Sequence, residues 1–148
     1  MNPLSQIFKY FSLVLIIFLS LSTANAQNDA VFQITTDKKM SEVYNKVYAS
    51  LEDARFYVVF EPNIGKILAG FADKWGDEYN QNNLTGLRSM VFCNAWYANQ
   101  VSNKDPDMLA MCPLHLTLYE RDGKTTALFN RPTALSAGSP ADKVFQEI

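Results

Sequence analysis

The chain has 148 residues, of which 48% are hydrophobic and 19% are charged, and its formal net charge is −2. This length and hydrophobic content suffice for one globular domain with an ordinary core, and they exclude a chain that is disordered throughout. The sequence pI is about 5.3, and the basic residues are scattered. Nucleic-acid binding is not expected, because phosphate recognition needs a concentrated basic surface.

Residues 1–26 have the pattern of a secretory signal peptide. Lys9 precedes an apolar run of about 12 residues, and small residues fill the two positions that a signal peptidase must accommodate, Ala24 and Ala26. The run is shorter than the roughly 20 residues that a helix needs to cross a bilayer, and retention as an uncleaved anchor is the alternative. We expect cleavage after Ala26, which leaves a periplasmic or secreted domain, residues 27–148, without membrane contact.

The first part of this domain predicts a strand followed by a helix. Polar and apolar residues alternate over residues 30–35, which favours a half-buried strand. Apolar residues then recur at helical spacing over residues 40–54. Asp37 or Ser41 is expected to cap this helix, because either side-chain oxygen can accept from a free amide of the first turn.

A second strand and a second helix follow. The sequence Phe-Tyr-Val-Val-Phe within residues 56–61 favours a strand. From Ile64 onward, apolar residues fall on one helical face, so a helix of about four turns is expected to end near Gly76 or Tyr79. Residues 78–86 read as a polar loop rich in Asn and Gln.

The last part predicts a hairpin and a final helix. Three further strands are expected, at residues 87–93, 114–120 and 125–130. An excursion over residues 94–111 separates the first two, and Asp122-Gly123 favours a tight turn between the last two. Ser139 and Pro140 predict the start of a last helix. This order indicates an α+β domain with helices packed on one face of a mainly antiparallel sheet.

Four short strings accompany these elements. They are Ala54–Val58 after the first helix, Val91–Asn94 at a strand end, Cys112–Leu114, and the hairpin Leu118–Gly123. Together they resemble the DUF302 family, a bacterial domain family of unassigned function. The resemblance implies a TATA-binding-protein-like (TBP-like) α+β fold, often a homodimer, and no established catalytic residues.

The chain departs from this family pattern at three places. The family usually has Phe-Gly-Asn-Pro where residues 92–95 are Phe-Cys-Asn-Ala, and it usually has an aliphatic residue where Cys112 precedes proline. The segment of residues 74–86 is also longer than the family pattern. Both cysteines of the chain therefore stand where the resemblance leads one to expect other residues.

Cys93 and Cys112 lie at the two ends of the excursion. If the flanking strands are antiparallel neighbours, their Cα atoms can lie within the roughly 4.4–6.8 Å that a disulfide spans. An oxidising compartment would permit that bond, and closing the loop would stabilise the fold by about 3 kcal/mol. Two buried free thiols and a functional thiol pair are the alternatives.

The functional alternative involves more than the two thiols. Met108, Met111 and His115 accompany Cys112, and Cys93 is expected nearby. Thioether, thiolate and imidazole groups are the ligands that Cu(I) prefers, so copper is the alternative cofactor. The structural interpretation is that the methionines fill core gaps and that the histidine is exposed. No paired Cys or His spacing typical of zinc occurs.

The excursion also contains the candidate ligand-binding residues, Asn94, Trp96 and Tyr97, to which we add His115. Aromatic side chains beside amides are suited to a small-molecule pocket or to the contact surface of a dimer. The same residues can instead form the lid of the core. No catalytic motif is found, and a Cys–His pair or a surface carboxylate pair would need geometry that the sequence does not supply.

The sequence therefore predicts an exported module that binds a ligand or a partner without catalysing a reaction. The expected partners are an unidentified small molecule and a second copy of the chain, with no cofactor. The alternative function is a site for Cu(I) or for sulfur compounds built on Cys93 and Cys112.

Overall fold

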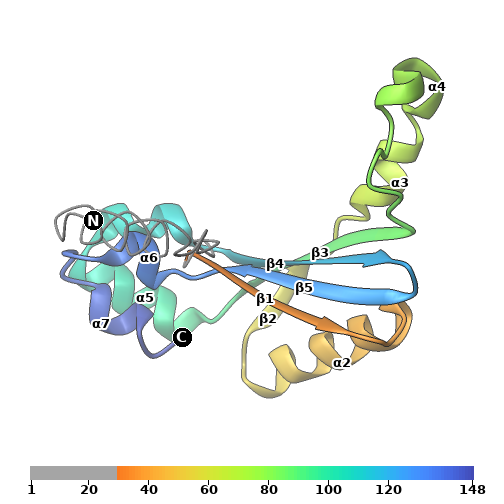
Figure 1. Ribbon diagram of the computed structural model, residues 1–148. Coiled ribbons are helices and arrows are strands. Elements are labelled where there is room, and N and C mark those ends of the chain that lie inside the picture. The colour runs from red at the N-terminus through yellow and green to blue at the C-terminus, as the bar shows by residue number, and fades with distance from the viewer. Residues whose placement is uncertain (1–29) are drawn as a thin grey trace, which may run out of the picture.

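The computed structural model describes residues 30–148, so the predicted signal peptide lies outside the described residues. Five strands form one antiparallel sheet in the order β1-β5-β4-β3-β2 (Figure 1). The strands are β1 (Val31–Thr36), β2 (Tyr57–Phe60), β3 (Gly86–Cys93), β4 (Leu114–Arg121) and β5 (Lys124–Asn130). The α+β class and the antiparallel sheet expected from the sequence are confirmed.

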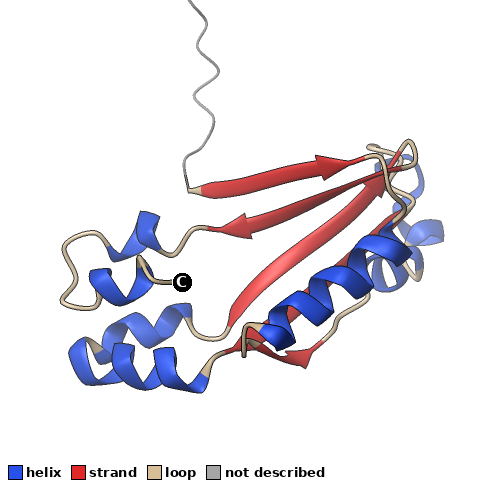
Figure 2. Cartoon of the chain, turned by 90° about the horizontal axis from the view of Figure 1, so that it is seen from below, coloured by secondary structure: helices blue, strands red, loops and turns tan. Residues whose placement is uncertain are grey.

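Helix α2 (Met40–Asp53) lies along one face of the sheet, as Figure 2 shows. Side chains alternate along a strand, so every second residue of the central strands faces this helix. Leu118 and Met90 are fully buried there. The buried members of this core cluster are Met40, Tyr44, Met90, Phe92, Leu114, Leu118 and Ala127. This layer of helix on sheet is the main hydrophobic core.

The start of α2 differs from the prediction. Neither Asp37 nor Ser41 caps the helix, because α2 begins after Lys39, which makes no side-chain cap. Asp37 instead pairs with Lys124 on the hairpin at 2.9 Å. The Met40 amide donates to the Glu120 carboxylate of β4 at 2.6 Å. A carboxylate of the sheet thus satisfies the helix start, which local sequence reasoning does not reveal.

The predicted second helix is broken. It consists of α3 (Ile64–Ala69), α4 (Ala72–Trp75) and the 3₁₀ turn η1 (Gly76–Glu78). Short i to i+3 bonds at Gly70 and Phe71 interrupt it, and Gly76 ends α4 with a φ of +50° that glycine adopts readily. Residues 64–85, here called the arm, project away from the sheet in Figure 1.

Four helical elements lie at the end of the sheet opposite the arm (Figure 1). They are α5 (Ala95–Lys104), η2 (Pro106–Met111), α6 (Thr133–Ser136) and α7 (Asp142–Phe145). A second core cluster of Val101, Ala141, Val144 and Phe145 holds them together. The excursion of residues 94–111 is therefore mostly helical, although the sequence assigned it no helix. Val101 is the single buried residue of α5, which leaves its hydrophobic periodicity weak.

Two turn predictions can be compared with the structure. Asp122 and Gly123 have φ values of 53° and 72°, which confirms the tight hairpin turn between β4 and β5. Ser139 accepts a hydrogen bond from the Ala141 amide and donates one to Asp105, but α7 begins only at Asp142.

Within residues 30–148, no helix has both the length and the apolar character that a membrane span requires.

Candidate functional site

The predicted ligand residues of the excursion lie at the start of α5. Asn94 is the N-cap of this helix, and its side-chain oxygen accepts from the amides of Trp96 and Tyr97 at 3.0 and 3.2 Å. Tyr97 stacks on Phe56 with ring centroids 5.9 Å apart. The Asn94 oxygen therefore serves the helix start, and Tyr97 is held against the rim of the core.

Three of the four predicted ligand residues line one hollow. Asn94, Trp96 and Tyr97 surround a volume of about 380 Å³ together with Arg55 and Tyr57. Trp96 and Tyr57 are 65% and 53% exposed, so the hollow is open to solvent. An open aromatic surface of this kind suits contact with a partner better than enclosure of a small ligand.

Cys93 and Cys112 meet as the sequence predicts for the two ends of the excursion. Both are free, half-buried thiols, and both line one cavity of about 10 Å³, which is no larger than the space for about one water molecule. Burial raises the pKa of the Cys112 thiol, and the nearby Cys93 raises it further. A raised pKa keeps the thiol protonated at neutral pH, which disfavours it as a nucleophile.

The remaining soft-metal candidates lie elsewhere. Met108 packs against the second core cluster, and Met111 and His115 line a separate cavity of about 200 Å³. The structure thus brings together Cys93 with Cys112, and Met111 with His115, but in different cavities. Among residues 30–148, no group of three or more His, Cys, Asp or Glu side chains is placed to hold a metal ion.

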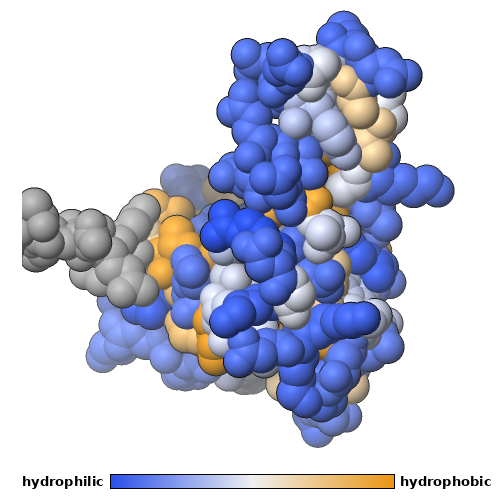
Figure 3. Space-filling view, turned by 45° about the vertical axis from the view of Figure 1, so that its right-hand side comes forward, coloured by the Kyte–Doolittle hydropathy of each residue, from blue (hydrophilic) through white to orange (hydrophobic). Residues whose placement is uncertain are grey.

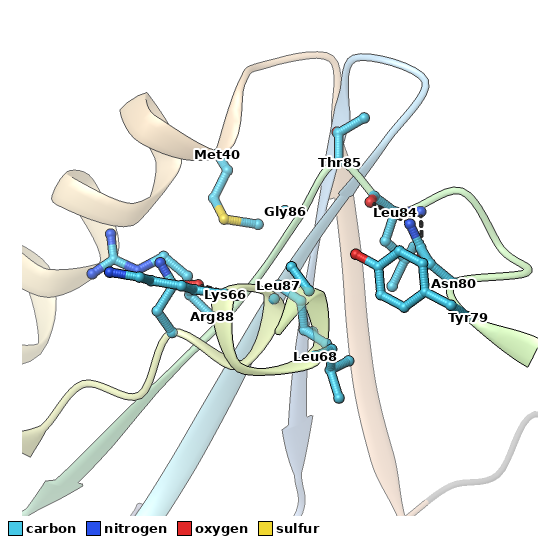
Figure 4. Close-up of a pocket in the computed structure, with 13 residues that line it drawn as sticks. Met40, Lys66, Leu68, Tyr79, Asn80, Leu84, Thr85, Gly86, Leu87 and Arg88 are labelled. Atoms are coloured by element: carbon cyan, nitrogen blue, oxygen red, sulfur yellow. Dashed lines mark hydrogen bonds between the residues drawn. The ribbon is translucent and has the colours of Figure 1, made fainter. Parts of the chain in front are cut away.

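A further cavity of about 350 Å³ lies where the arm meets the sheet, and we call it the arm cavity. Figure 3 shows hydrophobic surface at the base of the projecting arm, framed by polar residues. Its lining residues are Met40 of α2, then Asn63, Gly65, Lys66, Leu68, Ala69, Tyr79, Asn80, Leu84 and Thr85 of the arm and its flanks, and Gly86, Leu87 and Arg88 of β3. Figure 4 shows these side chains around the opening.

Two glycines bring the walls of the arm cavity close together. A Cβ atom on Gly65 would lie 3.2 Å from the Leu87 backbone nitrogen, so α3 approaches β3 there with no room for a side chain. A Cβ atom on Gly86 would lie 2.9 Å from the Met40 methyl group. Met40 therefore reaches across β3 and closes the end of the cavity beside α2.

Arg88 supplies the most unusual polar group of the arm cavity. Its guanidinium carbon lies 3.7 Å from the centroid of the Tyr44 ring, which is a cation–π contact. Burial, followed by the hydrogen bond that the Tyr44 hydroxyl donates to Glu61, raises the pKa of Tyr44 to about 12. The Arg88 Nε atom is buried and has no hydrogen-bond partner among the described residues.

Sequence reasoning missed the arm cavity. Its walls come from separate parts of the chain, and the available signals were the long segment of residues 74–86 and a charge on the buried face of a strand. Arg88 shares the face of Met90 and Phe92, which are both core residues. Arg88 is half-buried on this face, and its guanidinium stacks on Tyr44 without an ion pair in the described residues.

Comparison with known proteins places this architecture in a family. The model of the family described as "Domain of unknown function DUF302" matches residues 32–148. A crystal structure of an uncharacterized conserved DUF302 protein from Bacillus stearothermophilus superposes with a TM-score of 0.68 at 19% identity, over 80% of this chain and 89% of that chain. No match was found among curated proteins. The structural likeness supports the fold, and the match to the family model shows that the chain belongs to the DUF302 family.

Proposed function

We propose that this DUF302 protein is an exported, non-catalytic ligand-binding module, and that a small molecule binds in the arm cavity. The observation that carries the proposal is a cavity of about 350 Å³ in which the cationic side chains of Lys66 and Arg88 stand beside apolar walls. Ligand pockets commonly have volumes of roughly 300–1,000 Å³, with apolar walls and a few polar groups. The arm cavity has both features.

The polar groups of the cavity support binding better than catalysis. The Asn80 side chain exchanges two hydrogen bonds with the Leu84 backbone, and the Thr85 hydroxyl donates to Glu120. Tyr79, Lys66 and Arg88 remain as groups that can donate to a ligand. These groups can orient and hold a molecule by hydrogen bonds and charge.

Export is proposed from the sequence of residues 1–26, with cleavage after Ala26 and residence in the periplasm or outside the cell. Cleavage there would leave only a few residues before β1, which begins at Val31.

Ligand binding in the arm cavity can be tested with substitutions at two adjacent residues of α3. Leu68 lines the arm cavity, whereas Ile67 is not among its lining residues and is 56% exposed. Leu68→Trp is expected to fill the cavity, and Ile67→Trp adds the same indole outside it. In a thermal-shift screen of small fragments, hits that stabilise the wild type are expected to stabilise Ile67→Trp but not Leu68→Trp.

Two results would count against this function. Hits that still stabilise Leu68→Trp bind elsewhere, and hits lost equally in both variants report a general effect of the added indole. A screen without a single stabilising fragment would also contradict the proposal, because a preformed cavity of this size should accept some of them.

We also propose that the protein forms a symmetric dimer through the open edge of β1. Phe32 and Ile34 are 42% and 57% exposed on this strand, which has no lysine or proline to discourage pairing. The other edge strand, β2, is less open, because the Val58 amide already donates to the Glu52 carboxylate. Antiparallel pairing of two β1 strands would place the same surface on both sides of a two-fold axis.

Sedimentation velocity tests this dimer. The wild type is expected to sediment as a dimer, and Ile34→Lys is expected to sediment as a monomer because two charges would face the same contact. Val59→Lys is the matched control, since Val59 is 63% exposed on β2. A monomeric wild type, or equal dissociation by both lysines, would exclude β1 as the contact.

The alternative function, a site for Cu(I) or sulfur compounds, rests on Cys93 and Cys112. Their cavity of about 10 Å³ leaves little space for a ligand, and the raised pKa of Cys112 opposes thiolate formation. The same proximity favours a disulfide between them in an oxidising compartment. We therefore propose a structural role for the pair.

A further inference from the structure

We infer that the ligand of the arm cavity is a small organic carboxylate with an apolar body. This inference rests on the proposed function, because it names the class of molecule that the cavity binds. Lys66 of α3 and Arg88 of β3 both line the cavity, and no Asp or Glu is among the lining residues. In Figure 4 both side chains extend toward the side of the cavity where α2 lies.

Two carboxylates outside the cavity lining, those of Glu120 and Glu61, accept hydrogen bonds from other residues. Glu120 accepts hydrogen bonds from the Met40 amide and the Thr85 hydroxyl, at 2.6 and 3.0 Å. Glu61 accepts from the Tyr44 hydroxyl at 2.6 Å. The ion pairs of the described domain involve Lys38, Lys46, Arg121 and Lys124 as cations. Neither cavity cation forms an ion pair within the described domain, and a bound anion would supply one.

The geometry of Arg88 favours a carboxylate as that anion. The Tyr44 ring covers one face of the guanidinium, which leaves the donors in the guanidinium plane available. The two Nη–H groups at the end of the guanidinium form a two-donor edge that matches the two oxygens of a carboxylate. A carboxylate paired with this edge would give Arg88 an ion-pair partner, which it lacks among the described residues.

The other walls of the cavity require an apolar body on the ligand. Leu68, Leu87 and Leu84 line the cavity beside Met40. Figure 4 shows the Tyr79 ring at the end away from Arg88, with its hydroxyl directed toward the leucines. An inorganic anion would meet the charges and leave these walls unfilled. An organic acid would match both parts of the site.

Calorimetric titration of the full-length mature protein with hexanoate and hexanol tests the inference, because the two probes share a chain and differ in charge. Hexanoate is expected to bind at least about tenfold more tightly than hexanol. Lys66→Gln and Arg88→Gln are each expected to weaken hexanoate binding about tenfold and to leave hexanol binding unchanged. Lys104→Gln is the matched control, because Lys104 ends α5 outside the cavity lining and its loss is expected to have no effect.

The possible results separate this inference from the proposed function. Equal affinity for hexanol would show a cavity for neutral molecules, so the carboxylate would be wrong and the binding function would stand. Phosphate binding as tightly as hexanoate would reveal a simple anion site and overturn the inference. If neither hexanoate nor hexanol binds while fragments still distinguish Leu68→Trp from Ile67→Trp, the inference fails alone. Lys66 is exposed, so its variant keeps the test valid if Arg88→Gln does not fold.

Discussion

Replacing Leu118 with alanine is expected to lower the free energy of unfolding by about 3 kcal/mol. Leu118 lies in β4, in the middle of the sheet, and its side chain is fully buried beneath α2. Truncation would remove apolar contacts and leave a cavity that the surrounding sheet cannot close completely. Urea denaturation monitored by circular dichroism measures the change.

Leu135→Ala is the matched control for this prediction. Leu135 is 69% exposed, so the same truncation there is expected to change the free energy of unfolding by less than about 0.5 kcal/mol. A loss at Leu118 no larger than the loss at Leu135 would contradict the layer of α2 on the sheet as the main core.

The second large effect is expected from a disulfide between Cys93 and Cys112. In protein exported to an oxidising compartment, we expect no reactive thiol after unfolding without reductant, and a stabilisation of about 3 kcal/mol over the reduced protein. The two residues flank α5 and η2 and line the same small cavity, so the bond would tie both ends of this helical segment to the sheet. Thiol titration and paired urea curves measure both quantities.

A variant with Cys93→Ser and Cys112→Ser separates this bond from other effects of reductant. Its unfolding curve should be the same with and without reductant, whereas the wild-type curve should shift. Two reactive thiols in the unfolded exported protein would refute the disulfide. They would leave two buried free thiols, or a site for Cu(I) or sulfur compounds, as the alternatives for the pair.

The strands could be predicted from the sequence because their signals are local. Alternation in β1, the β-branched and aromatic run of β2, and the Asp122-Gly123 turn each act within a few residues. The predicted strand ends differ from the observed ones by at most one residue. Helix α2 was predictable for the same reason, since its apolar stripe continues over 14 residues.

The helical segments at the two ends of the molecule were harder to predict than the strands, because tertiary contacts determine where these helices begin and end. Helix α5 buries only Val101, so its own pattern is weak, and its start depends on the Asn94 cap. The arm, in contrast, has a strong helical pattern that predicts more helix than the structure contains. Its stripe of Ile67, Phe71 and Trp75 predicts one continuous helix, but these side chains remain exposed and the helix breaks at Gly70.

The candidate site was only partly predictable. Sequence reasoning grouped Asn94, Trp96 and Tyr97, and the structure places them around one hollow, while His115 lines another cavity. The arm cavity depends on the close approach of α3 to β3 at Gly65, and no local pattern encodes that contact. The signals in the sequence were the long segment of residues 74–86 and the charge of Arg88 on the face of β3 that carries core residues.

The most direct test of the arm cavity as the ligand site is amide chemical-shift mapping by NMR with hexanoate and hexanol. Binding of either probe is expected to shift the amides of Lys66, Gly86 and Arg88, which line the cavity, and to leave those of Trp96 and Tyr97 in place. Shifts confined to Trp96 and Tyr97 would contradict the account and place the ligand in the open hollow beside α5.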